Sequence, residues 1–350
     1  MTKKKIDFRK LSLAQKVAKV EGIYIWSPKL RELITQMDYC REFSKIASEP
    51  KSMLITGIQG AGKTKLIERY MEKFPRTVTS EKAIVPVLSA DVGVPATVKS
   101  LAGDRLAALG DPAADKGTVA NQTRRLCMYL KKCETQMIIL DEFQHFIDRE
   151  SQKVLRTISD WLKVLINRTK LPIILFGMPK SEIILDTLGN EQLKRRFSAR
   201  ETLEPFGWGE DEEQQKEMKQ FLTKLDEALS SLLPRRSHLA DTDTAHLIHI
   251  ATNGIIEKIM KLVRGAAASA LRSDAEYIDL DLFANSYEEN LANDSPEDPN
   301  PFHIGISKRK TDKGRKPRRR LSSSSNSSAT NRRVRASKKK LSLSEVLSQR

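Results

Sequence analysis

Cysteines, aromatic residues and long apolar runs are scarce in this chain of 350 residues. Its three cysteines, Cys40, Cys127 and Cys133, are an odd number and show no CxxC spacing. They therefore do not fit a disulfide framework or a cysteine zinc site, and we expect reduced, structural thiols. No run approaches the roughly 18 apolar residues of a membrane span, and no apolar signal segment follows the lysine-rich start. We expect no membrane association and a cytoplasmic location.

Negative charge is also scarce toward the end of the chain. The stretch 304–350 has 16 Lys or Arg residues against two acidic ones, Asp312 and Glu345, so it carries most of the net charge of +16. A Ser-rich basic segment almost without aromatic residues buries too little surface to fold alone. We predict a linker and disordered basic tail over 293–350. The tail fits a flexible DNA-binding arm, a partner-docking segment or a nuclear localisation signal, and the sequence leaves these three open.

Short apolar runs bounded by turn signals are typical of strands buried on both faces. They occur at 52–56, 83–88, 137–140 and 171–176. Because stretches with helical spacing lie between them, we predict an α/β fold with a mostly parallel sheet sandwiched by helices.

The remaining patterns set the domain limits. Residues 1–45 read as a helical lead-in, broken near Ser27 and Pro28, which fit the cap and first turn of a helix. The α/β domain is expected over 46–206. Beyond it the strand signal stops, and helical spacing predicts a smaller domain over 207–292.

A glycine-rich loop joins the first strand to the next helix. The eight residues from Gly57 to Thr64 satisfy GxxxxGK[ST], in the strand and helix context that this phosphate-binding motif requires. Glycines let backbone N–H groups approach the phosphates, and the lysine reaches the β and γ phosphates. The threonine hydroxyl is expected to hold Mg²⁺. The predicted ATP-binding residues here are Gly57, Gln59, Gly60, Ala61, Gly62, Lys63 and Thr64.

Two carboxylates follow the apolar strand at 137–140, as in a Walker B element. Asp141 is expected to bind ATP-bound Mg²⁺ together with Thr64, and Glu142 to polarise the attacking water. Phosphoryl transfer also needs positive charge on the transferred group, often supplied in trans. The basic residues before Phe197 are the candidates, with Arg196 the first choice for an arginine finger and Arg195 the second.

With these elements in this order, the chain resembles an AAA+ P-loop ATPase with a C-terminal helical lid. Several segments are similar to the TniB/TnsC transposition regulators, over roughly 10–290. These segments are Leu140–His145, Gly177–Pro179, Leu193–Phe197 and Thr252–Leu262.

The resemblance implies an ATPase that assembles as a ring or helical homo-oligomer on double-stranded DNA in the bacterial cytoplasm. It would link a target-selector protein of the TniQ/TnsD kind to the transposase and disassemble on ATP hydrolysis. In initiator-like AAA+ proteins the segment between the second strand and Walker B faces the DNA pore. By that resemblance Lys99 and Thr118 are the expected DNA contacts.

Two residues depart from the family pattern. Met178 follows the glycine of the fourth strand, where a small polar sensor-1 residue is expected, and Glu257 stands where many lids carry a sensor-2 arginine. Both departures suggest slow, regulatory hydrolysis. Two other interpretations remain open: a replication-loader or motor-type AAA+ ATPase acting on another protein, and a nucleotide-switched DNA-binding module with negligible turnover.

Overall fold

The computed structural model describes residues 11–80, 82–93, 96–147, 152–186, 191–210, 212–294 and 299–303. The predicted basic tail over 304–350 lies outside the described residues, as does part of the linker before it. The helices are α1 (Leu13–Glu21), α2 (Pro28–Ser44), α3 (Lys63–Met71), α4 (Val98–Ala108), α5 (Val119–Lys132), α6 (Gln152–Thr169), α7 (Ile183–Asp186), α8 (Glu191–Arg196), α9 (Glu212–Leu229), α10 (Thr242–Thr252), α11 (Ile256–Arg272) and α12 (Leu280–Asn290).

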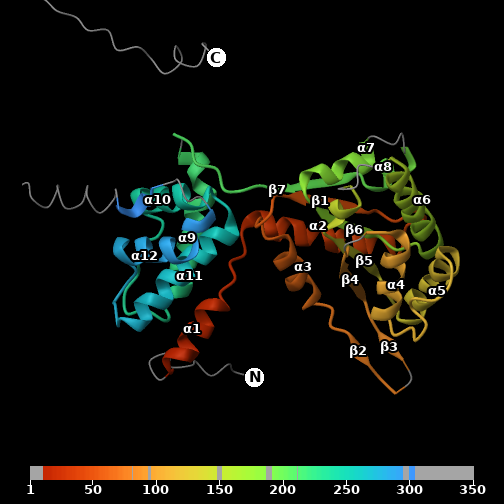
Figure 1. Ribbon diagram of the computed structural model, residues 1–350, viewed down its shortest axis with the longest axis horizontal. Helices are drawn as coiled ribbons and strands as arrows, with labels where there is room; N and C mark the ends of the chain where they lie inside the picture. Colours follow the sequence, from red (N-terminus) through yellow and green to blue (C-terminus); the bar gives the residue numbers. More distant parts are fainter. Residues whose placement is uncertain are drawn as a thin grey trace, which may run out of the picture. The chain divides into compact units, whose positions relative to one another are not determined.

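A parallel sheet forms the centre of the α/β part (Figure 1). Its strands are β1 (Met53–Gly57), β4 (Val87–Asp91), β5 (Met137–Asp141), β6 (Ile173–Gly177) and β7 (Ala199–Leu203), in the order β4-β5-β6-β1-β7. Neighbouring strands pair in parallel throughout. The carboxyl ends of β1 and β5 therefore lie at the same edge of the sheet, with β6 between them.

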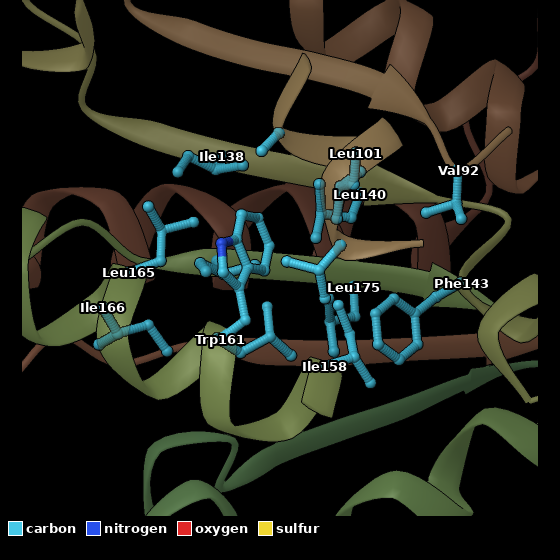
Figure 2. Packing of buried hydrophobic residues seen from close by; sticks show 14 of the residues in the cluster. Val92, Leu101, Ile138, Leu140, Phe143, Ile158, Trp161, Leu165, Ile166 and Leu175 are labelled. Atoms are coloured by element: carbon cyan, nitrogen blue, oxygen red, sulfur yellow. The ribbon is translucent and has the colours of Figure 1, made fainter. Parts of the chain in front are cut away.

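Alternating side chains bury both faces of this sheet, which is why its strands read as continuous apolar runs. Leu54 points into a cluster with α4, α5 and α6, whereas Met53 and Ile55 point into a cluster with α2 and α3. Figure 2 shows the first cluster, where Trp161 and Leu165 of α6 lie beside sheet residues that include Ile138, Leu140 and Leu175. The predicted fold class, a parallel sheet sandwiched by helices, is confirmed.

The run at 83–88 forms two strands rather than the single one expected. Pro86 separates them: β3 (Ala83–Ile84) pairs antiparallel with β2 (Thr77–Val78) in a separate hairpin, and β4 enters the main sheet. Proline has no N–H to donate to a ladder, so it breaks the pairing at this point. Its carbonyl still accepts the Gln136 N–H at 2.7 Å.

Strand β7 was missed from the sequence. It lies at the edge of the sheet beside β1 and reads ARETL, with only Leu203 fully buried. An edge strand with half-buried polar residues carries no continuous apolar run, so its pattern gave no signal.

The N-terminal helices begin as expected. The Ser27 hydroxyl accepts the Leu30 N–H at 3.2 Å, and Pro28 occupies the first turn of α2. Helix α1 packs against α11, and Val20 and Ile25 belong to the apolar cluster of the helices from α9 to α12. The start of the chain therefore shares its core with residues more than 200 positions later. The limits expected for the four segments stay a prediction.

The structure also bears on the expected thiols, membrane spans and metal sites. None of the three cysteines forms a disulfide, and burial raises the pKa of the Cys40 thiol to about 11. In the described part of the chain, no helix is both long and apolar enough to cross a membrane. Among the described residues, no group of three or more His, Cys, Asp or Glu side chains could hold a metal ion.

Candidate nucleotide site

The loop between β1 and α3 has a backbone shaped by its glycines. Gly60 and Gly62 adopt left-handed conformations, with φ of 78° and 95°, and Gly62 caps the start of α3. L side chains rarely adopt such angles, which accounts for glycine at both places. A Cβ added at Gly62 would meet no atom within 4 Å, so the loop has open space there for a phosphate chain. The helix N-terminus behind it supplies partial positive charge.

Lys63 is largely buried at the base of this loop. Its Nζ donates hydrogen bonds to the carbonyl oxygens of Gly57 at 2.8 Å and Ile58 at 3.0 Å. Burial lowers the pKa of the Lys63 ammonium, while the carboxylates of Glu142 and Asp141 act in the opposite direction. The cation is thereby held between the loop and the two acidic residues.

Thr64 and Asp141 meet at the point where a metal ion is expected. The Thr64 hydroxyl donates to Asp141 Oδ2 at 2.9 Å, and the Glu142 N–H donates to Asp141 Oδ1 at 2.8 Å. Burial raises the pKa of the Asp141 carboxyl, and these two hydrogen bonds oppose that shift. Hydroxyl and carboxylate oxygens are the ligands Mg²⁺ prefers, so the pair fits an ATP-bound Mg²⁺.

Glu142 follows directly in an unusual backbone conformation. Its φ is 55°, in the left-handed region, which turns the chain away from β5 into a short 3₁₀ helix, η2 (Phe143–Phe146). Its Oε2 accepts a hydrogen bond from Gln144 Nε2 and lies 3.9 Å from His145 Nε2. The side chain is about a third exposed, at 37%, and faces the same cavity as Lys63 and Thr64.

A cavity of about 660 Å³ lies over the loop, and most of its lining residues come from three stretches of sequence. These are the stretch from Glu21 to the start of α2, the loop with the first turns of α3, and α11; Glu142, Phe221 and Asn290 add single contacts. The lid contacts the loop directly, since the Glu257 N–H donates to the Gly60 oxygen at 3.1 Å. Apolar side chains of the cavity include Ile23, Tyr24, Ile25, Phe221, Ile256 and Met260.

Sequence reasoning missed two cations that α11 contributes to this cavity. Lys261 and Arg264 of α11 line it, one and two turns beyond Glu257. Arg264 also donates to the Ile23 oxygen at 2.7 Å. The spacing 257, 261 and 264 places all three on one helix face, and this was the available signal.

The two candidate arginine fingers lie outside this cavity and differ from each other. Arg196 is 8% exposed and donates to Asn167 Oδ1 at 2.5 Å. Arg195 is 71% exposed and lies 3.2 Å from a carboxylate oxygen of Glu49. Arg195 is therefore the more accessible of the two to a second molecule, although it would have to leave Glu49 and although the sequence ranked Arg196 first.

The two predicted DNA contacts are exposed but lie on different helices. Lys99 is in the first turn of α4, and Thr118 is the N-cap of α5, where its hydroxyl accepts the Asn121 N–H at 3.3 Å. The basic residue Arg125 of the same segment is used internally. It contacts Asp111 at 3.2 Å and donates to the carbonyl oxygen of Ala113.

The parallel sheet, the glycine loop, the acidic end of β5 and the helical lid define an AAA+ P-loop ATPase fold. Solved structures agree. The Orc1 protein of Aeropyrum pernix in complex with DNA is 15% identical with a TM-score of 0.51, over 79% of this chain and 69% of that one. Cdc6p from Pyrobaculum aerophilum is 14% identical with a TM-score of 0.57, over 78% and 71%. At these identities the likeness shows the fold alone.

The family is shown by the sequence. Residues 20–207, more than half of the chain, match the family described as Bacterial TniB protein. The chain therefore belongs to the TniB family. No curated protein sequence matches it.

Proposed function

We propose that this protein is an ATP-dependent regulator of DNA transposition. It oligomerises on double-stranded target DNA, links a target-selector protein of the TniQ/TnsD kind to the transposase, and disassembles when ATP is hydrolysed. The observation that carries the proposal is that Lys63, Thr64, Asp141 and Glu142 meet at one site in a chain of the TniB family. Family membership supports the transposition role, and the lack of a membrane-spanning helix among the described residues fits a cytoplasmic location.

The site residues divide the chemistry of ATP hydrolysis among them. The loop from Gly57 to Gly62 and Lys63 bind the phosphates, and Thr64 and Asp141 would hold Mg²⁺, which neutralises charge on the β and γ phosphates. Glu142 orients a water whose oxygen bonds to the γ-phosphorus as the bond to the β–γ bridging oxygen breaks. ADP and phosphate leave, and the water proton passes through the Glu142 carboxylate to solvent.

In this proposal an arginine from a second subunit stabilises the negative charge on the transferred γ-phosphoryl group. Arg195 is exposed on α8, outside its own cavity, as a residue acting in trans must be. Hydrolysis would then depend on assembly. The DNA side rests on Lys99 and Thr118, both exposed between β4 and β5, and on the structural likeness to an Orc1 protein solved with DNA.

Imaging of the full chain with duplex DNA and a non-hydrolysable ATP analogue tests this proposal. We expect rings or filaments on DNA that require nucleotide and are absent with Lys63→Ala. The Glu142→Gln variant should bind ATP and form longer-lived DNA complexes than the wild type. DNA-free rings, or no assembly, would contradict the proposal.

One alternative has an observation in its favour. The fold shared with the Orc1 and Cdc6p structures is equally that of a replication loader or another AAA+ ATPase that acts on a protein. Such a protein would turn ATP over quickly without DNA, whereas the transposition regulator is expected to be slow. Steady-state ATP hydrolysis with and without duplex DNA separates the two.

A further inference from the structure

Gln144 makes two hydrogen bonds at the centre of the catalytic site although its side chain is no part of the Walker motifs. It lies in η2, directly after the β5 carboxylates, and is 5% exposed. Its Nε2 donates to Glu142 Oε2, and its Oε1 accepts the backbone N–H of Met178 at 3.1 Å. One carboxamide thus connects the end of β5 with the end of β6.

The partners fix which way this carboxamide points. The Met178 N–H is a donor and requires an acceptor, so it selects Oε1. The Glu142 carboxylate, when ionised, only accepts, so it selects the NH₂ group. The reversed amide would face a donor with a donor and an acceptor with an acceptor, and both bonds would be lost. The environment therefore defines a single orientation.

Room for the carboxamide comes from a glycine. A Cβ added at Gly177 would lie 3.2 Å from Gln144 Oε1 and 2.2 Å from Ser181 Oγ. Any side chain at residue 177 would therefore displace the 3₁₀ helix η3 (Pro179–Glu182), which carries Ser181, and press on Gln144. The glycine at the end of β6 and the glutamine after β5 form one packed unit.

We propose that Gln144 is the positioning residue for Glu142, an inference that rests on the proposed ATP hydrolysis. Its Nε2 fixes one carboxylate oxygen and so directs the rest of the carboxylate toward the cavity that Lys63 and Thr64 share. Its Oε1 ties this arrangement to the end of β6. At that place the family pattern has a polar side chain, whereas Met178 has only its backbone N–H to donate. The side-chain hydrogen bond between the two strand ends is therefore made by Gln144, which follows β5.

Two substitutions separate positioning from packing. Gln144→Met keeps the length of the side chain and removes both hydrogen bonds. Gln144→Glu keeps an acceptor for the Met178 N–H but places a carboxylate against Glu142. We expect both variants to lower kcat for ATP hydrolysis by about tenfold or more, with KM for ATP within about twofold of the wild type. Gln220→Met, at an exposed position in the middle of α9, is the matched control.

The Glu142→Gln background gives a second readout. If Gln144 acts through Glu142, adding Gln144→Met there should change the residual rate by less than about twofold, because residues that act as a unit are not additive. A further tenfold loss would show that Gln144 acts elsewhere and would overturn the inference. Wild-type kcat in Gln144→Met, or restored kcat in Gln144→Glu, would overturn it as well.

Two measurements distinguish a variant that does not fold from one that folds but hydrolyses ATP slowly. Thermal unfolding and binding of a fluorescent ATP analogue establish that each variant is folded, and Gln144→Glu, nearly identical in shape, carries the test if Gln144→Met does not fold. A wild-type protein that does not hydrolyse ATP would overturn the proposed function and this inference together. A hydrolysing wild type with an unaffected Gln144→Met variant would overturn the inference alone.

Discussion

The Thr64 hydroxyl donates a hydrogen bond of 2.9 Å to Asp141 Oδ2, joining the start of α3 to the end of β5. The two residues are 77 positions apart in the sequence. Parallel pairing of β5 with β6 and of β6 with β1 brings their strand ends to one edge of the sheet. The order of the strands thus brings Thr64 and Asp141 into contact, and this contact is what supports the predicted Mg²⁺ site.

Asp141→Asn tests the metal role. The asparagine oxygen can still accept the Thr64 hydroxyl, but the negative charge is gone. We expect the affinity for ATP in the presence of Mg²⁺ to fall at least about tenfold, with little change in its absence. Titration of a fluorescent ATP analogue with and without Mg²⁺ measures this. Asp160→Asn, on the exposed part of α6, should leave both affinities unchanged; an unchanged Mg²⁺ effect in Asp141→Asn would refute the assignment.

Replacing the two arginines of α8 one at a time should affect different properties: stability for Arg196 and the rate of ATP hydrolysis for Arg195. Arg196→Ala removes a buried side chain bonded to Asn167 and is expected to cost about 1–3 kcal/mol in the free energy of unfolding. Arg195→Ala should leave the melting temperature unchanged and lower hydrolysis at least about tenfold. Because a finger acts in trans, the wild-type rate per molecule should rise with protein concentration and the Arg195→Ala rate should not. A wild-type rate of ATP hydrolysis in Arg195→Ala would refute Arg195 as the arginine finger and leave Arg196 as the candidate.

Lys99→Ala should weaken duplex DNA binding at every sequence tested. One phosphate contact fewer per subunit lowers the slope of log affinity against log salt by about 1. Thr118→Ser keeps the hydroxyl cap of α5 and should bind DNA as the wild type does, whereas Thr118→Val loses both the cap and the contact. Fluorescence anisotropy over a salt series measures the slope. Lys216→Ala, on α9, is the control, and an unchanged slope in Lys99→Ala would remove it from the interface.

His249 gives the lid a defined pH dependence. Burial lowers the pKa of this imidazole below 6.5, assisted by His246 and opposed by the bond to the Phe206 carbonyl oxygen at 3.1 Å. A depressed pKa means that the folded state binds the proton less readily than the unfolded chain. The stabilising contribution is therefore complete above about pH 6.5 and is lost as the pH falls through the folded pKa.

The melting temperature between pH 7.5 and 5.0 measures this effect. We expect the wild type to lose stability more steeply than His249→Gln over that range. His246→Gln, at an exposed position beside Trp208, should retain most of the wild-type slope. Equal slopes for the wild type and His249→Gln would rule out this histidine as the source.

The phosphate loop and the buried strands could be predicted because their signals are local. GxxxxGK[ST] specifies a backbone shape through its glycines, and strands buried on both faces are uniformly apolar. The division at Pro86 was readable in principle, since a proline inside an apparent strand argues against an unbroken ladder. Strand β7 was not, because half-buried polar residues at a sheet edge look like loop.

Tertiary packing decided the rest. Arg195 and Arg196 are neighbours in sequence, but successive residues on a helix point about 100° apart, so one is buried and the other exposed. Which one faces inward depends on where Asn167 of α6 lies. Lys261 and Arg264 enter the cavity only because α11 packs beside the N-terminal segment. Their spacing shows that they share a helix face, but not that this face meets that segment.

The hydrogen bond from Arg264 to the Ile23 oxygen spans 241 positions of the chain. Both residues line the nucleotide cavity, so its wall on that side exists only after almost 270 residues have been synthesised. Contacts between such distant residues form slowly, because closing a long loop costs conformational entropy. On a ribosome, the phosphate loop would emerge long before the cavity above it is complete. ATP bound in that cavity is therefore a ligand of the finished fold, and its retention reports that the two ends of the folded region have met.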